Sequence, residues 1–357
     1  MIIRDYGLYR RVWPFATSRE LFFTVGVARP VVPSNERVLR LYRINSTGNI
    51  DLLQNLSLQE PGIDTSGQPY FKPGLGLIIP AWNSEFYTIG KTIFVIFKSY
   101  DFNEYKVVYV DEHGSYGKHF FTDAQGTRIC IGVGKGWNGK PGRVSYTPRG
   151  AYLLCSEDGG DHWSQIYEIK YPTAIYSGVI VDDIIAFTLR ERGAVVVSFN
   201  GGKHFREIIL GASARIITFC RIEGSDVAIL SSDDALFISE DFTNWKKIKL
   251  PTKGLALRYP TVAESSVFFT GVGNGSWIFK VSLDNFNIKD IMAREIHYDI
   301  APRLALFNRK LYLGSELYGK LYSIEMSEFK PFNRVTNLKI KFTFYINLLK
   351  SKAKIGK

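Results

Sequence analysis

A short polar motif recurs along this chain at nearly constant spacing, and that regularity limits the folds available to it. Residues 156–163 read Ser-Glu-Asp-Gly-Gly-Asp-His-Trp, and residues 198–205 read Ser-Phe-Asn-Gly-Gly-Lys-His-Phe. Weaker copies begin at Ser239, Ser282 and Ser323, so that successive serines are 42, 41, 43 and 41 residues apart. A fixed period of this length is the sequence signature of a repeat architecture.

Each repeat has room for four short strands. Around the second copy, apolar runs at 174–181, 183–189, 194–199 and 205–210 are separated by Asp, Arg, Gly and Asn residues. Short apolar runs bounded by such turn residues are typical of all-β proteins, and no segment shows a 3.6-residue apolar stripe over a helical length. About 42 residues with four strands is the length of one β-propeller blade.

The anchors of the repeat give the number of blades. Asn45 and Asp111 also follow apolar runs, and with the five serines they bring the anchors to seven. The 66-residue interval between these two contains the Gly/Pro/Ser-rich stretch 57–76, which we interpret as an insertion loop. The prediction is a single all-β domain over residues 1–349, a seven-bladed β-propeller of four-stranded antiparallel blades, with six blades as the alternative.

The last apolar run of the chain has a predicted role in this architecture. Residues 338–348 alternate between apolar and polar, as a half-buried strand does. We expect this strand to pair with the first blade and close the ring, which would remove exposed sheet edges. The alternative is a free C-terminal extension. Residues 350–357 then form a basic C-terminal tail.

The two clear motifs resemble the Asp-box, or BNR, repeats of sialidase-like β-propellers. In that family the motif forms the turn between the third and fourth strands of a blade, away from the usual ligand site. Asp and Asn side chains can accept hydrogen bonds from backbone N–H groups of their own turn, and glycine permits positive φ. The resemblance therefore implies a structural role for Ser156, Asp158, Gly160, Trp163, Ser198, Asn200, Gly202, Phe205, Ser239, Asp241, Trp245, Ser282 and Asp284.

The catalytic residues of a sialidase are not evident. The first arginine of that family lies in a Phe/Tyr-Arg-Ile-Pro sequence, and the nearest match here is Ala28-Arg29-Pro30. The glycine-rich run 132–142 has Pro141 where a phosphate-binding loop needs Ser or Thr. No histidines have metal-ligand spacing. We name no catalytic residue and expect no cofactor and no metal, and we favour a binding protein over an enzyme.

One set of charged residues recurs at blade spacing. If each motif ends a third strand, each innermost strand begins on the opposite face, near the mouth of the central channel. A mostly positive mouth suits an anionic ligand, such as an acidic sugar, a carboxylate or a phosphate. The alternative is that these arginines pair with acids of neighbouring blades and line a water-filled channel. The candidates at strand starts are Arg128, Tyr176, Arg215, Arg258 and Arg303, and those in the connections between second and third strands are Arg149, Arg190, Asp233 and Glu316.

The predicted function is recognition. We expect a non-enzymatic recognition or scaffold propeller that binds a glycan or a protein partner through the channel mouth, and an attachment role fits this. One alternative is a sialidase-like glycoside hydrolase acting on an acidic glycan. Another is an assembly factor that docks on an anionic surface or nucleic acid, because residues 335–357 contain six lysines and no acid.

Cellular location and redox state follow from weaker signals. No run of 18 apolar residues and no secretory signal are evident, so we expect a cytoplasmic protein or one assembled into a larger particle. The three cysteines, Cys130, Cys155 and Cys220, lie in apolar runs without metal-ligand spacing. Their odd number and setting predict buried free thiols.

Overall fold

The structure is a computed structural model of the chain. It describes residues 2–6, 10–16, 20–27, 38–45, 47–57, 63–65, 67, 69–83, 93–101, 104–136, 139–140, 143–144, 148–222, 225–233, 235–249, 256–263, 266–272, 276–284, 287–296, 303–315 and 319–332. The chain is a seven-bladed β-propeller of four-stranded antiparallel blades, as the repeat predicts. Two compact units form, one of residues 1–28, 41–52 and 220–357, the other of residues 29–40 and 53–219.

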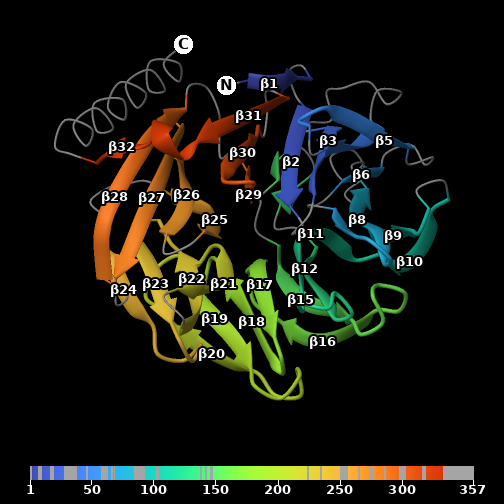
Figure 1. Cartoon of the computed structure of the whole chain (residues 1–357). Coiled ribbons are helices and arrows are strands. Elements are labelled where there is room, and N and C mark those ends of the chain that lie inside the picture. Colours follow the sequence, from blue (N-terminus) through green and yellow to red (C-terminus); the bar gives the residue numbers. More distant parts are fainter. Residues whose placement is uncertain are drawn as a thin grey trace, which may run out of the picture. The chain divides into compact units, whose positions relative to one another are not determined.

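The sheet strands of the first four blades follow one another in chain order (Figure 1). Blade 1 has β2 (Arg10–Ala16), β3 (Leu21–Val27), β4 (Val38–Ile44) and β5 (Ile50–Ser57). In blade 2, β6 (Ile63–Thr65) and β7 (Tyr70–Lys72) both pair with β8 (Gly76–Asn83), followed by β9 (Phe94–Ser99) and β10 (Lys106–Asp111). Blade 3 has β11 (Gly114–Thr122), β12 (Ile129–Lys135), β15 (Gly150–Ser156) and β16 (Ser164–Ile169), and blade 4 has β17 (Ile175–Val181), β18 (Ile184–Leu189), β19 (Ala194–Ser198) and β20 (Arg206–Ile209).

The remaining three blades complete the fold. Blade 5 has β21 (Ile217–Ile222), β22 (Ser225–Ser231), β23 (Ala235–Ser239) and β24 (Lys246–Lys249). Blade 6 has β25 (Ala256–Ala263), β26 (Ser266–Val272), β27 (Ser276–Asp284) and β28 (Asn287–Ile296), with β32 (Lys330–Pro331) added at its edge. Blade 7 has β29 (Arg303–Phe307), β30 (Lys310–Gly314) and β31 (Lys320–Glu325), and its fourth strand is β1 (Ile2–Asp5).

The apolar runs of the sequence become the buried strands of each blade. In blade 4, every residue of β19 is buried, whereas β20 at the outer edge is largely exposed. Leu153 and Ile169 of blade 3 lie in one buried cluster with Phe187 and Val196 of blade 4, so the core is formed between the faces of neighbouring sheets. On the outermost strand β24, exposed lysines protect the sheet edge from pairing with another chain.

Blade 2 differs from the sequence prediction in two ways. Residues 57–76 are not an insertion loop, because β6 and β7 lie within them and pair with β8. Asp111 is also wrong as an anchor, since it ends the outermost strand. The turn between β9 and β10 instead contains Asp101, whose Oδ1 accepts a hydrogen bond from the Glu104 N–H at 3.1 Å. Asn45 is at its predicted place, between β4 and β5.

The first strand of the chain completes the last blade. β1 pairs antiparallel with β31, with Asp5 opposite Lys320 and Ile2 opposite Tyr322. The strand predicted over 338–348 and the tail at 350–357 lie outside the described residues. Within the described part of the chain there is no helix of the length and apolarity that a membrane span requires.

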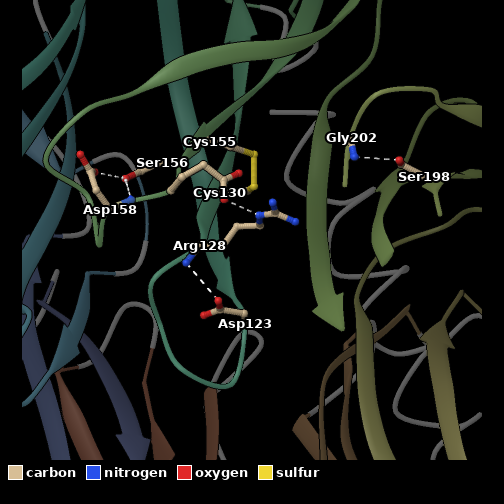
Figure 2. Close-up of a disulfide and its surroundings, with 9 residues drawn as sticks. Asp123, Arg128, Cys130, Cys155, Ser156, Asp158, Ser198 and Gly202 are labelled. Carbon is tan, nitrogen blue, oxygen red and sulfur yellow. Dashed lines mark hydrogen bonds and ion pairs between the residues drawn. A yellow bond between two sulfur atoms is a disulfide. The ribbon is translucent and has the colours of Figure 1, made fainter. Parts of the chain in front are cut away.

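Two of the three cysteines are joined. Cys130 on β12 lies directly opposite Cys155 on β15, and the two form a disulfide between Cα atoms 4.1 Å apart (Figure 2). The prediction of free thiols is therefore wrong for this pair. Cys220 is a free, half-buried thiol, and burial raises its pKa to about 12, so the thiolate is scarce at neutral pH.

Candidate functional site

Each blade has two ends with different contents. Because its strands are antiparallel, the third-to-fourth-strand turn lies at one end, together with the first-to-second-strand turn. We call this the turn end; in blade 4 it comprises residues 182–183 and 199–205. The other end, where the innermost strand begins and the second strand turns into the third, we call the start end. In blade 4 it comprises residues 170–175 and 190–193.

A closed set of hydrogen bonds builds the turn end of blade 3. The Ser156 hydroxyl donates to Asp158 Oδ1 at 2.8 Å and accepts from the Gly160 N–H at 2.8 Å. Asp158 Oδ1 also accepts from the backbone N–H groups of Asp161 and His162, both at 3.0 Å. The Trp163 indole N–H donates to the Gly160 carbonyl at 3.0 Å. The Asp158 carboxylate therefore acts inside its own turn, as an Asx turn residue does.

The same bonds recur at the turn ends of blades 4 and 5. The Ser198 hydroxyl accepts from the Gly202 N–H at 2.9 Å, and Asn200 Oδ1 accepts from the His204 N–H at 2.9 Å. In blade 5 the Ser239 hydroxyl donates to Asp241 Oδ1 at 3.0 Å, and the indole N–H of Trp245 donates to the residue three positions before it, Phe242, at 3.1 Å.

Two turns depart from this pattern. Phe242 stands where blade 3 has Gly160 and adopts a positive φ of 59°. That conformation is costly for a bulky residue, and the buried Phe242 ring compensates for it. In blade 6 the predicted members Ser282 and Asp284 lie at the expected strand end, but Asp284 pairs with Asn287 in a tight hairpin, and the Ser282 hydroxyl contacts the Ser266 hydroxyl at 3.2 Å.

The pKa values of the turn carboxylates agree with a structural role. Burial alone would raise the pKa of Asp158, but hydrogen bonds from His162, Ser156 and Asp161 outweigh it and lower the pKa well below the ordinary range. Backbone hydrogen bonds from Asn244 and Thr243 likewise lower the pKa of Asp241. Both groups stay ionised at neutral pH, which makes them unsuited to donate a proton to a leaving group.

A buried lysine joins the turn end of blade 3 to blade 2. Lys98, at the end of β9, donates to the Gly159 carbonyl and to Asp161 Oδ2, both at 2.9 Å, and its side chain is 1% exposed. Lys106 lies 2.9 Å from the other oxygen of Asp161, which the Tyr100 hydroxyl also contacts. The three donors hold the pKa of Asp161 at about 2 although burial opposes them. We call this group the Asp161 cluster.

Arg128 was predicted at the channel mouth, and this is wrong. The innermost strand of blade 3 is β11, so Arg128 lies in the turn between β11 and β12, at the turn end. Its backbone N–H donates to Asp123 Oδ2 at 3.1 Å (Figure 2). Its guanidinium lies 2.7 Å from Glu157. Arg128 therefore supports the Ser156 turn.

The start ends of blades 3 and 4 bring several predicted residues together. Tyr176, the second residue of β17, is 7% exposed. The Arg190 guanidinium lies 5.7 Å from the centre of its ring, a cation–π arrangement, and the centre of the His119 ring of β11 lies 6.4 Å from it in an edge-on geometry. We call Tyr176, Arg190 and His119 the Tyr176 cluster. His119 carried no sequence signal, because it lies within a strand whose register could not be read.

Backbone hydrogen bonds fix the position of this cluster. Glu191 Oε2 accepts from the Ala174 N–H at 3.0 Å and from the Thr173 hydroxyl at 3.3 Å. The segment that leads into β17 is thereby attached to the β18–β19 turn. The Thr188 hydroxyl donates to the Arg215 carbonyl at 2.6 Å, which places Arg215 beside the same blade, just before β21 as predicted. The cluster thus has a rigid backbone beneath it.

Arg149 lies at the same end, at the base of the connection between β12 and β15. It is exposed, and its backbone N–H donates to the Lys135 carbonyl at 3.0 Å. Ala151, two residues further on, shares a buried cluster with Leu189, the residue before Arg190. The start ends of blades 3 and 4 are therefore adjacent.

The other candidates belong to the other unit. Asp233 is half-buried in the β22–β23 connection. Arg258 lies in β25 opposite Thr270, and Arg303 is the first residue of β29, opposite Gly314. These three positions match their predicted strand places. Glu316 lies outside the described residues.

Three of the carboxylates described at the start ends of blades 3 and 4 have partners, whereas Glu112, in the connection before β11, is exposed. Glu168 lies 2.5 Å from Lys135, and Glu207 accepts from Arg192 at 3.0 Å and from the Tyr171 hydroxyl at 2.9 Å. Glu191, the third of them, is bound to the backbone N–H of Ala174 and the hydroxyl of Thr173. Among the described residues no group of three or more His, Cys, Asp or Glu side chains could hold a metal ion.

Comparisons with known proteins show the fold. No family model matches this chain, and no curated protein matches it in sequence. Among solved structures, YCF48 bound to a D1 peptide is similar over 90% of this chain and 94% of its own, with 9% identity and a TM-score of 0.57. YCF48 from Cyanidioschyzon merolae covers 92% and 98%, with 7% identity and a TM-score of 0.53. Virginiamycin B lyase from Staphylococcus aureus covers 89% and 97%, with 12% identity and a TM-score of 0.58.

Proposed function

We propose that the protein is a non-enzymatic recognition propeller that binds a segment of a protein partner at the start ends of blades 3 and 4. The observation that supports this most directly is the Tyr176 cluster, in which Arg190 lies over a buried ring on a fixed backbone. Rigid aromatic and arginine side chains are the residue types that dominate protein interfaces. One structural neighbour was solved with a peptide bound, which is compatible with this function.

The finer alternatives have less support. The turns at Ser156, Ser198 and Ser239 share the bonding pattern we associate with Asp-box propellers, which include sialidases. A hydrolase or a lectin at this site would still need carboxylates or polar groups facing the ligand, and Glu191, Glu207 and Glu168 bind other residues of the chain. A scaffold or assembly role is consistent with the same peptide site.

We expect Arg190→Ala to weaken peptide binding at least tenfold, because a charge-assisted contact contributes about 1.5 to 3 kcal/mol. A peptide array and a glycan array, both probed with the labelled full chain, would first identify a bound peptide, whose affinity is then measured by fluorescence anisotropy. Arg206→Ala is the matched control, since Arg206 lies 4.9 Å from the Phe199 ring at the turn end of the same blade.

The control should bind within twofold of the native chain. Hits on the glycan array with none on the peptide array would overturn the proposal in favour of carbohydrate recognition. Equal losses with both arginine variants would also contradict it, because binding would then not be specific to the start end.

A further inference from the structure

The turn between β4 and β5, at the turn end of blade 1, contains a motif that the proposed function does not use. It reads Asn45-Ser46-Thr47, which is the Asn-x-Ser/Thr motif of N-linked glycosylation without proline at the middle position. The same motif begins at Asn55, inside β5, and at Asn274, which lies outside the described residues. Asn45 is therefore the copy that the structure places in a turn.

Hydrogen bonds within this turn fix the orientation of the Asn45 amide. Its Oδ1 accepts from the Thr47 hydroxyl at 2.6 Å, from the Thr47 N–H at 3.1 Å and from the Asn49 N–H at 2.9 Å. Because a backbone N–H can only donate, these contacts identify the amide oxygen, and the amide nitrogen points away from them. Donors on the oxygen also stabilise the deprotonated amide, which favours loss of a proton from Nδ2 as a new bond forms there.

The Asn45 nitrogen and the tip of the turn are accessible. Nδ2 donates one hydrogen to Asp51 Oδ2 across a long contact of 3.4 Å, and among the described residues its second hydrogen has no acceptor. Thr47, Gly48 and Asn49 are exposed, and Asn45 is half-buried. A Cβ placed on Gly48 would meet no atom of the described chain within 4 Å. A sugar attached to Asn45 therefore has room beside the turn.

The disulfide of blade 3 is a separate observation that agrees with such a modification. Bonds such as Cys130–Cys155 form and persist mainly in oxidising environments, on secreted and cell-surface chains. N-linked sugars are carried on surface loops of chains in the same environments. One of the locations expected from the sequence, the cytoplasm, is not compatible with this modification.

We infer that Asn45 is an acceptor site for N-linked glycosylation, independently of the peptide site proposed above. The donor is an oligosaccharide joined through its anomeric carbon to a polyprenyl diphosphate. The bond from that carbon to the phosphate oxygen breaks, and the diphosphate leaves with the electron pair. The anomeric carbon bonds to Asn45 Nδ2, and the proton that Nδ2 loses passes to a base of the transferase. The Thr47 hydroxyl orients the amide for this step.

The turn of blade 5 supplies matched controls. There the Thr243 N–H donates to Asp241 Oδ1 and the Thr243 hydroxyl to Asp241 Oδ2, both at 2.8 Å, as the same groups of Thr47 donate to Asn45. Thr243→Ala therefore removes an equivalent hydroxyl from a turn that has no amide nitrogen to modify. Asn45→Asp removes the nitrogen from the turn of blade 1 and keeps an acceptor of the kind that Asp241 provides.

The test is the mass of the peptide that contains Asn45, taken from the chain purified from the cells that make it. Cleavage by endoproteinase Asp-N before Asp51 separates this peptide from the motif at Asn55. The variants are compared in the full chain secreted from insect cells behind an added leader, and circular dichroism melts verify that each of them folds.

We expect the native peptide to be heavier by whole sugar residues, with fragmentation placing them on Asn45. In insect cells, Thr47→Ala should lower the modified fraction by about tenfold or more, because the motif requires a hydroxyl at this position. Thr47→Ser, which keeps the hydroxyl, should retain most of the modification. Asn45→Asp should abolish it with little change in melting temperature, and Thr243→Ala should match the native chain.

Three results would overturn the inference. The first is an unmodified mass for the Asn45 peptide of the chain from its natural source. The second is equal modification of Thr47→Ala and the native chain in insect cells. The third is a sugar located on the Thr47 hydroxyl instead of the Asn45 amide.

Discussion

Replacing Cys130 and Cys155 together with alanine is expected to lower the free energy of unfolding by about 3 kcal/mol. The disulfide closes a segment of 25 residues, and breaking it restores the freedom of that segment in the unfolded chain. Both side chains are buried between blades 3 and 4, so alanine also leaves small cavities in that core. Urea unfolding of the native chain and of the variant, with and without a reductant, measures the difference.

The free cysteine supplies the control for this experiment. Cys220 is half-buried and unbonded to sulfur, so Cys220→Ala should cost less than about 1 kcal/mol and be insensitive to reductant. Adding reductant should remove most of the difference in unfolding free energy between the native chain and the double variant. If reductant leaves the native unfolding curve unchanged, the two cysteines are thiols and the disulfide assignment is wrong.

Asp161→Asn is expected to destabilise the chain by about 3 kcal/mol at neutral pH, because it leaves the ammonium of Lys98 buried without its carboxylate. Lys98 is 1% exposed and would keep only the Gly159 carbonyl and a neutral amide as acceptors. Thermal and urea unfolding at pH 7 measure the loss. The asparagine has nearly the volume of aspartate, so packing contributes little to it.

Removing the lysine should cost less than removing the carboxylate. In Lys98→Met, Asp161 keeps Lys106 at 2.9 Å and its side chain is 26% exposed, so the charge left behind is partly solvated. We expect a loss of about 1 kcal/mol, since a partly solvated carboxylate that keeps one cationic partner behaves more like a surface ion pair than a buried one. The double variant should be more stable than Asp161→Asn alone. If instead the two losses simply add, Lys98 and Asp161 are not coupled.

The Lys98–Asp161 pair also makes the free energy of unfolding depend on pH, in a direction that can be predicted. The pKa of Asp161 is about 2 in the folded chain, against an ordinary value of 3.8. A carboxylate with a lowered folded pKa stabilises the fold above its unfolded pKa, and this contribution is lost as the pH falls through the folded value. The advantage of the native chain over Asp161→Asn should therefore be complete above about pH 4 and mostly gone near pH 2.

The sequence predicts the blades well because the repeat appears in local chemistry. The side chains of a serine and an aspartate two residues apart form hydrogen bonds within their own turn. Such a turn can therefore be recognised in the sequence without knowing which strands pair. The resemblance to Asp-box repeats then placed the turns at Ser156, Ser198 and Ser239 between third and fourth strands, where the structure has them. Asn45 follows the same logic, with its Oδ1 accepting from the Asn49 N–H at 2.9 Å.

The misassignments have a different cause, since they depend on which strands pair. Arg128 was placed at the wrong end of blade 3 because β12 was taken for the innermost strand. The innermost strand is β11, which is antiparallel to β12, so the two strands begin at opposite ends of the blade. The Cys130–Cys155 pairing depends on the register of β12 against β15, and the Asp161 cluster joins residues 63 apart across two blades. A single sequence contains no direct record of such contacts. Two members of the Tyr176 cluster could be predicted from the sequence, because Tyr176 and Arg190 recur at blade spacing. The third member, His119, does not.

The pairing of β1 with β31 has a consequence for synthesis. Ile2 leaves the ribosome more than 300 residues before its partner Tyr322 exists. At about 5 to 20 residues per second, the first strand waits about 15 to 60 s for its partner. Blades 1 to 6 can fold from neighbouring sequence during that interval, but blade 7 cannot. During translation, Ile2–Asp5 is therefore a stretch that a chaperone or an aggregating neighbour could occupy before the native strand arrives.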